Sequence, residues 1–276
     1  MGGRGILGRL ALMGLGAVAA GVATQEISAS KVGKDLERNN FRGRTVTLAG
    51  GPALAATASV TSALGARDGR TAAAALTAGL AGGAVGLYDD IVGTRPEQKA
   101  YKGFKGHLGA LKDGRVTSGL VKIAGMGSAA VVASALLPRK NKNLVDVVLG
   151  AGLIAGMANL LNLLDLRPGR ALKAGTLIGA PLSVGAKGGI AAGATGAAVG
   201  LLPQDLKEEI MLGDAGANAL GALLGVSMAA RSSRWIKAGL LGVIAGLTLA
   251  SEKVSFTKVI ERTPVLREID EWGRRD

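Results

Sequence analysis

The sequence predicts an all-α, polytopic integral membrane protein with about nine transmembrane helices (eight to ten). Nine stretches of 13 to 22 residues contain no charged side chain, and together they cover 150 of the 276 residues. A helix needs roughly 20 mostly apolar residues to span a bilayer, because charged side chains at its ends can reach the interface. Nine such stretches are too regular for the core of a soluble protein. They are residues 10–25, 45–66, 71–88, 123–138, 147–164, 174–186, 188–204, 215–230 and 238–251.

The first stretch is flanked by Arg4 and Arg9, as the apolar region of a signal peptide is. Because eight further stretches follow, we interpret it as an uncleaved first helix. The sixth and seventh stretches are separated only by Lys187. They are therefore either two spans or a re-entrant pair.

Glycine and alanine fill the stretches. The third stretch carries glycines four residues apart, Gly79 and Gly83, and the seventh carries Gly196 and Gly200. Small residues at this spacing let helix backbones approach closely in lipid, where the hydrophobic effect does not drive helices together. These pairs predict close helix packing.

Composition excludes several functional classes. The formal net charge of +13 would suggest nucleic-acid binding in a soluble chain. Here the charges are confined to the segments between uncharged stretches, so we expect no nucleic-acid partner. The absence of cysteine excludes a disulfide scaffold and thiolate metal sites. A single histidine excludes multi-histidine zinc sites and argues against a Ser-His-Asp triad.

The distribution of Lys and Arg predicts an N-terminus outside and a C-terminus inside the cell membrane. With this orientation the inner loops carry 21 basic residues and the outer segments carry 11, and cytoplasmic loops are the more basic ones. Residues 1–250 then form a multi-span membrane domain. Its cytoplasmic loops are 25–44, 89–117, 165–173 and 203–214.

Two basic segments have membrane-related interpretations. Lys99, Lys102 and Lys105 in the second cytoplasmic loop are interpreted as binding anionic lipid. Residues 251–276 form a cytoplasmic or interfacial tail that mixes apolar and charged side chains and includes Trp272. This tail either lies at the membrane surface or covers a binding site at the cytoplasmic face as a lid.

Three cytoplasmic loops place carboxylates at helix ends. Asp89 and Asp90 follow the third stretch, Asp165 follows the fifth, and Asp214 precedes the eighth. We expect them at one depth, where carboxylates repel one another unless a cation joins them. Their oxygens suit Mg²⁺, which adds substrate phosphates as ligands. Simpler alternatives are a solvated helix end for the Asp-Asp pair and an N-cap for Asp214.

Polar side chains also occur within the spans. Asn159, Asn162 and Asp165 are three residues apart, so they lie along one side of the fifth helix. Amides in this position indicate a polar cavity or hydrogen bonds between helices. Lys122, near the start of the fourth span, is a candidate partner for a phosphate or a side chain that reaches the headgroups.

At these residues the sequence resembles the polyprenyl-phosphate N-acetylhexosamine-1-phosphate transferases (glycosyltransferase family 4). Members carry an Asp-Asp after the third helix, a motif like NxxNxxDGxDG, and an (F/M)MGDxGSxxLG motif. The similar segments here are Gly86–Asp90, Asn159–Gly169 and Met211–Gly221, and TVTLAGG at 45–51 is placed like the family's loop ending in Gly-Gly. The similarity spans most of the chain in the same order.

The resemblance implies an Mg²⁺-dependent enzyme of cell-envelope glycan synthesis. It would transfer a sugar-1-phosphate from a nucleotide sugar, UDP-linked in the family, to polyprenyl phosphate, releasing UMP at the cytoplasmic face. Its partners would be the lipid and the nucleotide sugar, with a homodimer as one option for its assembly. The implied roles are catalytic for Asp89, Asp90 and Asp165, substrate-binding for Asn159, Asn162 and Lys122, and metal-binding for Asp214.

Three departures from the family's pattern keep alternatives open. Pro168 stands where the motif has its second aspartate, Leu166 replaces the preceding glycine, and the tail lacks the family's histidines. These differences favour a non-catalytic homologue that binds lipid carrier or nucleotide sugar as a regulatory or assembly module. A small-solute transporter is a further alternative, but it predicts acidic residues near the bilayer midplane rather than at helix ends.

Overall fold

The protein is described by a computed structural model over residues 5–93, 95, 109, 114, 117–138 and 143–275. It is 79% helical with almost no sheet, which confirms the all-α prediction. Lys99, Lys102 and Lys105 lie outside the described residues. The elements are α1 (Ile6–Ala29), η1 (Lys31–Leu36), β1 (Glu37–Asn39), β2 (Thr45–Thr47), α2 (Gly50–Gly65), α3 (Gly69–Val92), α6 (Ser118–Leu136), α7 (Leu144–Leu164), α8 (Arg170–Leu182), α9 (Gly189–Leu206), α10 (Gly213–Arg231), α11 (Arg234–Ser251), α12 (Phe256–Arg262) and α13 (Pro264–Glu271).

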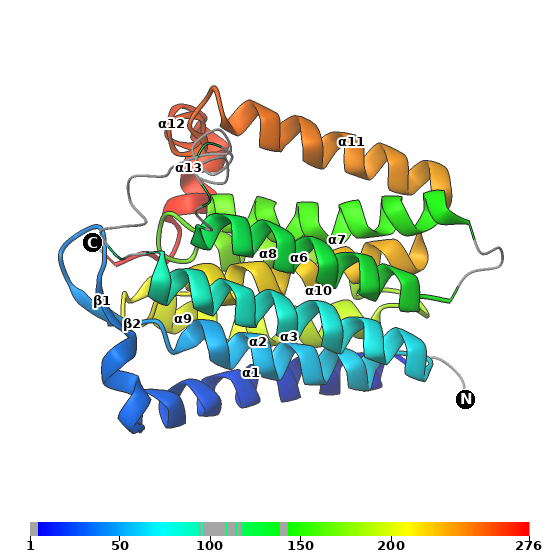
Figure 1. The fold of residues 1–276 in the computed structure, drawn as a ribbon. Helices are drawn as coiled ribbons and strands as arrows, with labels where there is room; N and C mark the ends of the chain where they lie inside the picture. The colour runs from blue at the N-terminus through cyan, green and yellow to red at the C-terminus, as the bar shows by residue number, and fades with distance from the viewer. Residues whose placement is uncertain are drawn as a thin grey trace.

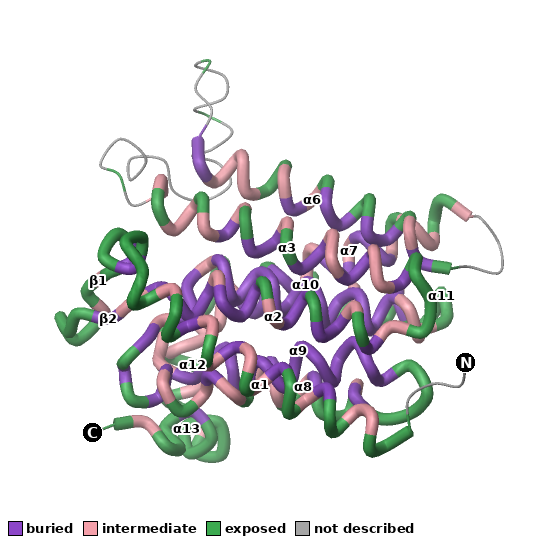
Figure 2. The backbone as a smooth tube through the Cα atoms, turned by 90° about the horizontal axis from the view of Figure 1, so that it is seen from below, coloured by how far each residue is buried: buried purple, intermediate pink, exposed green. Residues whose placement is uncertain are grey.

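Helix α10 is the centre of the fold. It packs against α7, α3, α2, α9 and α8, and these helices together with α6 form a closed ring around it, because each packs on the next. Helix α1 lies outside the ring on α9 and α2, and α11 lies outside it on α7 (Figure 1). The inner helices are more buried than the outer ones. The central α10 and the ring helix α9 are buried along most of their length, whereas the outer α11 buries only Lys237 and Ile244 (Figure 2).

Five of the described helices are long and apolar enough to cross a membrane, namely α1, α3, α6, α7 and α11. Each of the nine uncharged stretches overlaps a helix, but the stretch 45–66 begins with β2 and only its residues 50–65 form α2. The helices also differ in length and burial. Helix α8 has 13 residues and is therefore about 20 Å long, shorter than the roughly 30 Å hydrocarbon core. The central α10 is enclosed by other helices.

Glycines permit the close approach of the ring helices to α10. A Cβ at Gly221 would lie 2.6 Å from the Cα of Ala158 on α7, and one at Gly225 would lie 2.6 Å from the Cα of Ile154. The glycine spacing noted in the sequence has the same effect between α9 and α1, where a Cβ at Gly200 would lie 2.5 Å from the Cα of Ala17. The prediction of close packing at these small residues is confirmed.

The ends of the helices sort into two ends of the bundle. At one end, which we call the aspartate end, α3 and α7 terminate and α6 and α10 begin, so that Asp89, Asp90, Asp165 and Asp214 all lie there. The strands β1 and β2 and the helices α12 and α13 are at this same end (Figure 1). Thr117 caps α6 by accepting a hydrogen bond from the Leu120 amide.

A β-hairpin is attached to the aspartate end. Strands β1 and β2 pair antiparallel, with Arg38 opposite Val46. The Met211 amide donates to the carbonyl oxygen of Thr47 (2.8 Å), which joins the hairpin to the segment before α10. A Cβ at Gly50 would lie 2.8 Å from Cδ1 of Ile210, so the Gly-Gly pair after the hairpin lets α2 start against this segment.

We predict that Gly221→Ala and Gly225→Ala each destabilise the protein by about 1–3 kcal/mol, because the added methyl group meets backbone atoms that cannot move independently. The measurement is thermal unfolding of the detergent-purified protein. Gly21→Ala on α1 is the control, since no atom lies within 4 Å of its Cβ position. Equal melting temperatures for all three variants would contradict the packing account.

Candidate active site

The N-terminal turn of α10 is capped by a side chain from another helix. The two carboxylate oxygens of Asp90 on α3 accept hydrogen bonds from the backbone amides of Asp214 and Ala215, both at 3.0 Å. The first amides of a helix lack intrahelical partners and carry partial positive charge. Asp90 satisfies two of them and adds a favourable interaction with the helix dipole.

Two glycines make this capping contact possible. Gly86 lies one turn before Asp90, and a Cβ there would lie 2.6 Å from the Cα of Ala215. Gly213 has a positive φ of 62°, which glycine adopts without strain. A Cβ at Gly213 would also lie 2.9 Å from Oδ2 of Asp90. The glycines of GLYDD and MLGD therefore have a packing role.

Lys122 on α6 is surrounded by oxygen atoms from three other helices. Its ammonium group contacts Oδ2 of Asp214, donates to Oδ1 of Asn162 (3.2 Å), and lies 3.4 Å from Oδ2 of Asp89. The Asn162 amide nitrogen in turn donates to Oδ1 of Asp214. We call Lys122, Asp89, Asp214 and Asn162 the polar cluster. Its three charged side chains are between 20% and 27% exposed, so a ligand can reach them.

A cavity of about 650 Å³ opens beside the polar cluster, lined mainly by apolar residues of α6, α7 and α11. We call it the helix cavity. Asp89 and Lys122 form its polar end, and Ile123, Leu241 and Leu249 belong to its apolar part. The cavity thus joins a long apolar space to a charged end. Its full lining is Asp89, Gly119, Lys122, Ile123, Met126, Gly127, Ala155, Gly156, Asn159, Asn218, Leu241, Ile244, Ala245, Thr248 and Leu249.

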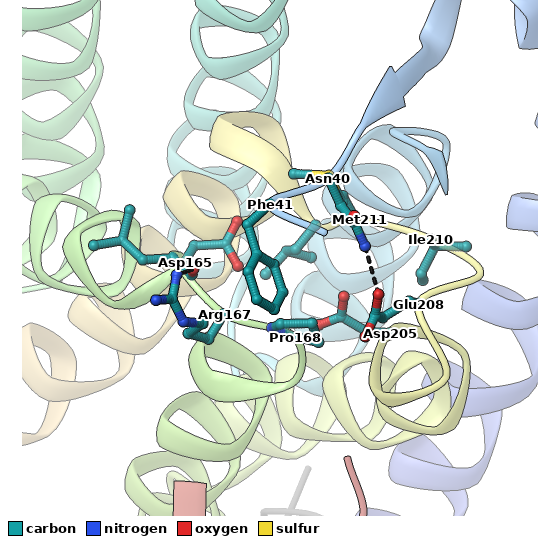
Figure 3. Close-up of a pocket in the computed structure, with 11 residues that line it drawn as sticks. Asn40, Phe41, Asp165, Arg167, Pro168, Asp205, Glu208, Ile210 and Met211 are labelled. Carbon is teal, nitrogen blue, oxygen red and sulfur yellow. Dashed lines mark hydrogen bonds between the residues drawn. The ribbon is translucent and has the colours of Figure 1, made fainter. Parts of the chain in front are cut away.

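A second, smaller pocket of about 200 Å³ lies among the loops of the aspartate end (Figure 3). We call it the loop pocket. The tip of the hairpin supplies Asn40 and Phe41, the loop after α7 supplies Asp165 and Arg167, and the last turn of α9 supplies Asp205. The Arg167 guanidinium lies 4.6 Å from the centre of the Phe41 ring, a distance typical of a cation–π contact. The remaining lining residues are Leu166, Pro168, Glu208, Ile210, Met211 and Leu212.

Glu208 holds the hairpin tip over the loop pocket. Its buried carboxylate accepts a hydrogen bond from Nδ2 of Asn40 (2.6 Å, Figure 3) and lies 3.2 Å from Nη1 of Arg42. Glu208 also has a φ of 59°, which is unusual for a residue other than glycine, Asn or Asp. A strained residue of this kind persists where its surroundings fix it, and here its side chain fixes the hairpin.

Asp165 lies between the loop pocket and the start of α10. Burial raises the pKa of Asp165 well above its ordinary value, and the negative charges of Asp205, Asp214 and Asp90 add to this effect. A hydrogen bond from the Gly213 amide acts in the opposite direction. The raised pKa favours the neutral acid, and a cation bound among these carboxyl groups would favour the charged carboxylate instead.

The structure places the predicted site residues in three neighbouring positions. Lys122, Asp89, Asp214 and Asn162 form the polar cluster, Asp90 caps α10, and Asp165 lines the loop pocket. Asn159 is apart from them. It is exposed toward the helix cavity and its nearest side-chain partner is Oγ1 of Thr248, at 3.4 Å. Asn159, Asn162 and Asp165 therefore lie in turn at the helix cavity, in the polar cluster and at the loop pocket.

Sequence reasoning missed the loop-pocket residues Asn40, Phe41, Arg167, Asp205 and Glu208. For Asp205 and Glu208, the charge composition of their loop was an available indication. The loop 203–214 contains Asp205, Glu208, Glu209 and Asp214 but only one basic residue, which is unusual for a loop assigned to the cytoplasm.

Within the described residues, no group of three or more His, Cys, Asp or Glu side chains converges as a metal site. The polar cluster provides two carboxylates, from Asp89 and Asp214, and the Asn162 carbonyl oxygen around one cationic group. Mg²⁺ in proteins is commonly bound through one or two carboxylates, with water and substrate phosphates completing its octahedron. The ligand chemistry therefore fits Mg²⁺ bound together with a phosphate.

The chain matches no protein-family model and no curated protein. Its function is inferred from the chemistry and geometry of these three neighbouring positions.

We predict that Lys122→Met lowers stability by about 1–3 kcal/mol, because two carboxylates lose the cation that they share. Thermal unfolding in detergent measures the effect. Lys253→Met, at an exposed position, is the control and should leave the melting temperature unchanged. Combining Lys122→Met with Asp214→Asn should restore part of the loss. Equal melting temperatures for Lys122→Met and the unmodified protein would contradict the claim that Lys122 offsets the charges of the two carboxylates.

Proposed function

We propose that the protein is an integral membrane enzyme that transfers a sugar-1-phosphate from a nucleotide sugar to polyprenyl phosphate with the help of Mg²⁺. The observation that carries this proposal is the position of the polar cluster. Asp89 and Lys122 line the apolar helix cavity, while Asp165 and Leu212 line the loop pocket beside the start of α10. A site of this kind suits one apolar phosphate and one polar phosphate substrate.

The helix cavity suits the lipid acceptor. A polyprenyl chain is apolar and fits a space lined by Ile123, Leu241 and Leu249, whereas its phosphate requires the charged end with Lys122. The Lys122 ammonium offers hydrogen-bond donors and a positive charge to that phosphate.

The loop pocket suits the nucleotide donor. Phe41 presents an aromatic ring, Arg167 a guanidinium group, and Asn40 and Asp205 polar atoms for a base or ribose. Pockets for small polar ligands combine such apolar surfaces with a few convergent polar groups. The donor's diphosphate would then extend from the loop pocket toward Asp214.

In the reaction, an oxygen of the polyprenyl phosphate attacks the phosphorus that carries the sugar. The bond from this phosphorus to the bridging oxygen breaks, and UMP leaves with that oxygen. Both substrates are anionic, so their phosphates must be held in line and their charge offset. Lys122 does part of this. Asp214 and Asp89 would hold Mg²⁺, which would supply further charge stabilisation to the phosphoryl oxygens. Asp90 acts by fixing the start of α10, and with it Asp214.

The membrane placement follows from the same proposal. We infer nine crossings of the cell membrane, with the N-terminus outside and the aspartate end in the cytoplasm, where nucleotide sugars are found. The short α8 and the enclosed α10 would cross inside the protein rather than in contact with lipid. The resemblance of the motifs around Asp89, Asp165 and Asp214 to the polyprenyl-phosphate N-acetylhexosamine-1-phosphate transferases supports this reading, as does their order along the chain.

We predict that membranes containing the protein transfer radiolabel from a UDP-N-acetylhexosamine to butanol-extractable lipid when polyprenyl phosphate and Mg²⁺ are supplied. Asp214→Asn and Asp89→Asn should each lower this transfer on the order of 100-fold or more, because the developing charge loses its stabilisation. Asp35→Asn removes an exposed carboxylate before the hairpin and should keep full activity.

Folded protein that binds nucleotide or lipid carrier but transfers label from no donor would contradict the enzymatic proposal. It would favour the non-catalytic binding module instead.

We also predict that Ala245→Phe raises the KM for polyprenyl phosphate on the order of tenfold and leaves the KM for the nucleotide sugar unchanged. Ala245 lines the helix cavity, so the larger side chain fills space intended for the prenyl chain. Val243→Phe, at an exposed position of the same helix, is the matched control. The expected tenfold change reflects one lost or blocked apolar contact, which amounts to about 1–3 kcal/mol. A rise in the donor KM instead would assign the helix cavity to the donor.

A further inference from the structure

The segment Phe256–Arg275, which we call the C-terminal segment, contains α12 and α13 and lies at the aspartate end (Figure 1). Its α13 is amphipathic in an unusual sense. It buries the charged Asp270, which is 7% exposed, and exposes apolar side chains such as Val265 and Ile269. Asp270 is the only buried residue of α13, so the polar contacts of this residue, and not an apolar face, attach the helix to the rest of the protein.

The central contact is a buried ion pair between α8 and α13. Nε and Nη2 of Arg170 donate to the two carboxylate oxygens of Asp270, at 2.7 and 2.9 Å. The two side chains are 5% and 7% exposed. A bidentate pair fixes the relative orientation of its partners, and removing one partner leaves a buried charge without compensation. Burial raises the pKa of Asp270, but hydrogen bonds from Arg170 and Arg274 outweigh it, so this pKa lies below its ordinary value.

Lys173 adds a second contact one turn further along α8. Its ammonium group donates to the carbonyl oxygens of Ile269 (3.0 Å) and Asp270 (2.7 Å). The carbonyl groups of a helix C-terminus lack intrahelical partners and carry partial negative charge. Lys173 therefore caps α13 from another helix.

Beyond α13, the chain bonds to the backbone of the segments that line the loop pocket. Nε of Arg274 donates to the carbonyl oxygen of Pro168 (3.1 Å), in the loop after α7. The Arg275 amide donates to the carbonyl oxygen of Leu206 (3.2 Å), at the end of α9. Nη1 of Arg42, beside the hairpin tip, donates to the carbonyl oxygen of Arg275 (3.1 Å). One segment thus connects all three walls of the pocket.

We propose that the C-terminal segment is a clamp that sets the geometry of the loop pocket, and that Arg170, Asp270 and Arg274 are positioning residues for the pocket's ligand. The identity of that ligand as a nucleotide donor rests on the proposed function. The clamp itself rests only on the contacts with Pro168, Leu206 and Arg42. Through the bond to Pro168 it adds a contact to the loop that carries Asp165 and Arg167.

The test uses the full-length protein in detergent and compares Asp270→Asn with Asp270→Glu and with Glu268→Gln. The last variant removes the same charge from an exposed position of α13. Hydrogen–deuterium exchange reports on the backbone amides of residues 166–173 and 204–212, and equilibrium binding of uridine diphosphate reports on the pocket.

We expect Asp270→Asn to speed exchange in both segments and to weaken uridine diphosphate binding, each on the order of tenfold (about 1.4 kcal/mol), since hydrogen bonds to a charged group are lost. Asp270→Glu should recover part of both losses, and Glu268→Gln should resemble the unmodified protein. In transfer assays the donor KM should rise while the acceptor KM stays within about twofold.

Faster exchange confined to residues 256–275, with the pocket segments unchanged, would overturn the clamp. If Asp270→Asn does not fold, Arg274→Gln decides the question, because it keeps the Arg170–Asp270 pair and removes the bond to Pro168. It should speed exchange at residues 166–170, and unchanged exchange there would again overturn the clamp. Failure of the unmodified protein to bind nucleotide would count against the proposed donor, whereas the exchange rates would still decide the clamp.

Discussion

The capping of α10 by Asp90 is the interaction on which the rest of the site depends. Helix α10 is enclosed by its neighbours, so its free N-terminal amides have little access to water and need partners within the protein. Asp90 supplies them only because Gly86 and Gly213 let α3 and α10 approach closely. The same approach carries Asp89 and Asp214 to Lys122. The capping of α10 and the pairing of Lys122 with two carboxylates thus depend on the same close contact between α3 and α10.

This arrangement explains why two different cavities lie near the start of α10. The ring of helices around α10 leaves an apolar space between α6, α7 and α11, while the loops at the aspartate end leave a polar one. The polar cluster touches the first, and Asp165 connects the second to the start of α10. Glu208 and the C-terminal segment then stabilise loops that the membrane helices alone would not fix.

Much of the helical architecture could be predicted from the sequence, because uncharged stretches and glycine spacing report directly on burial in a low-dielectric core. The gathering of Asp89, Asp90, Asp165 and Asp214 at one end followed from their positions at helix ends. The enclosure of α10 could not be predicted, since its composition matches that of lipid-facing helices. The loop pocket and the contacts of the C-terminal segment could not be predicted either. Phe41, Glu208 and Asp270 contact partners that are 100 or more residues away in the chain, as in the Arg170–Asp270 pair.

Binding of Mn²⁺, a paramagnetic substitute for Mg²⁺, tests the central claim most directly. The purified protein would be titrated with Mn²⁺ in micelles containing a short-chain prenyl phosphate, with electron paramagnetic resonance reporting the free ion. We expect Mn²⁺ to bind at one saturable site per chain and to be displaced by Mg²⁺. Asp214→Asn should abolish this binding, and Asp35→Asn should retain it. No saturable binding, or binding that survives Asp214→Asn, would contradict the claim that the polar cluster holds a divalent cation beside a phosphate.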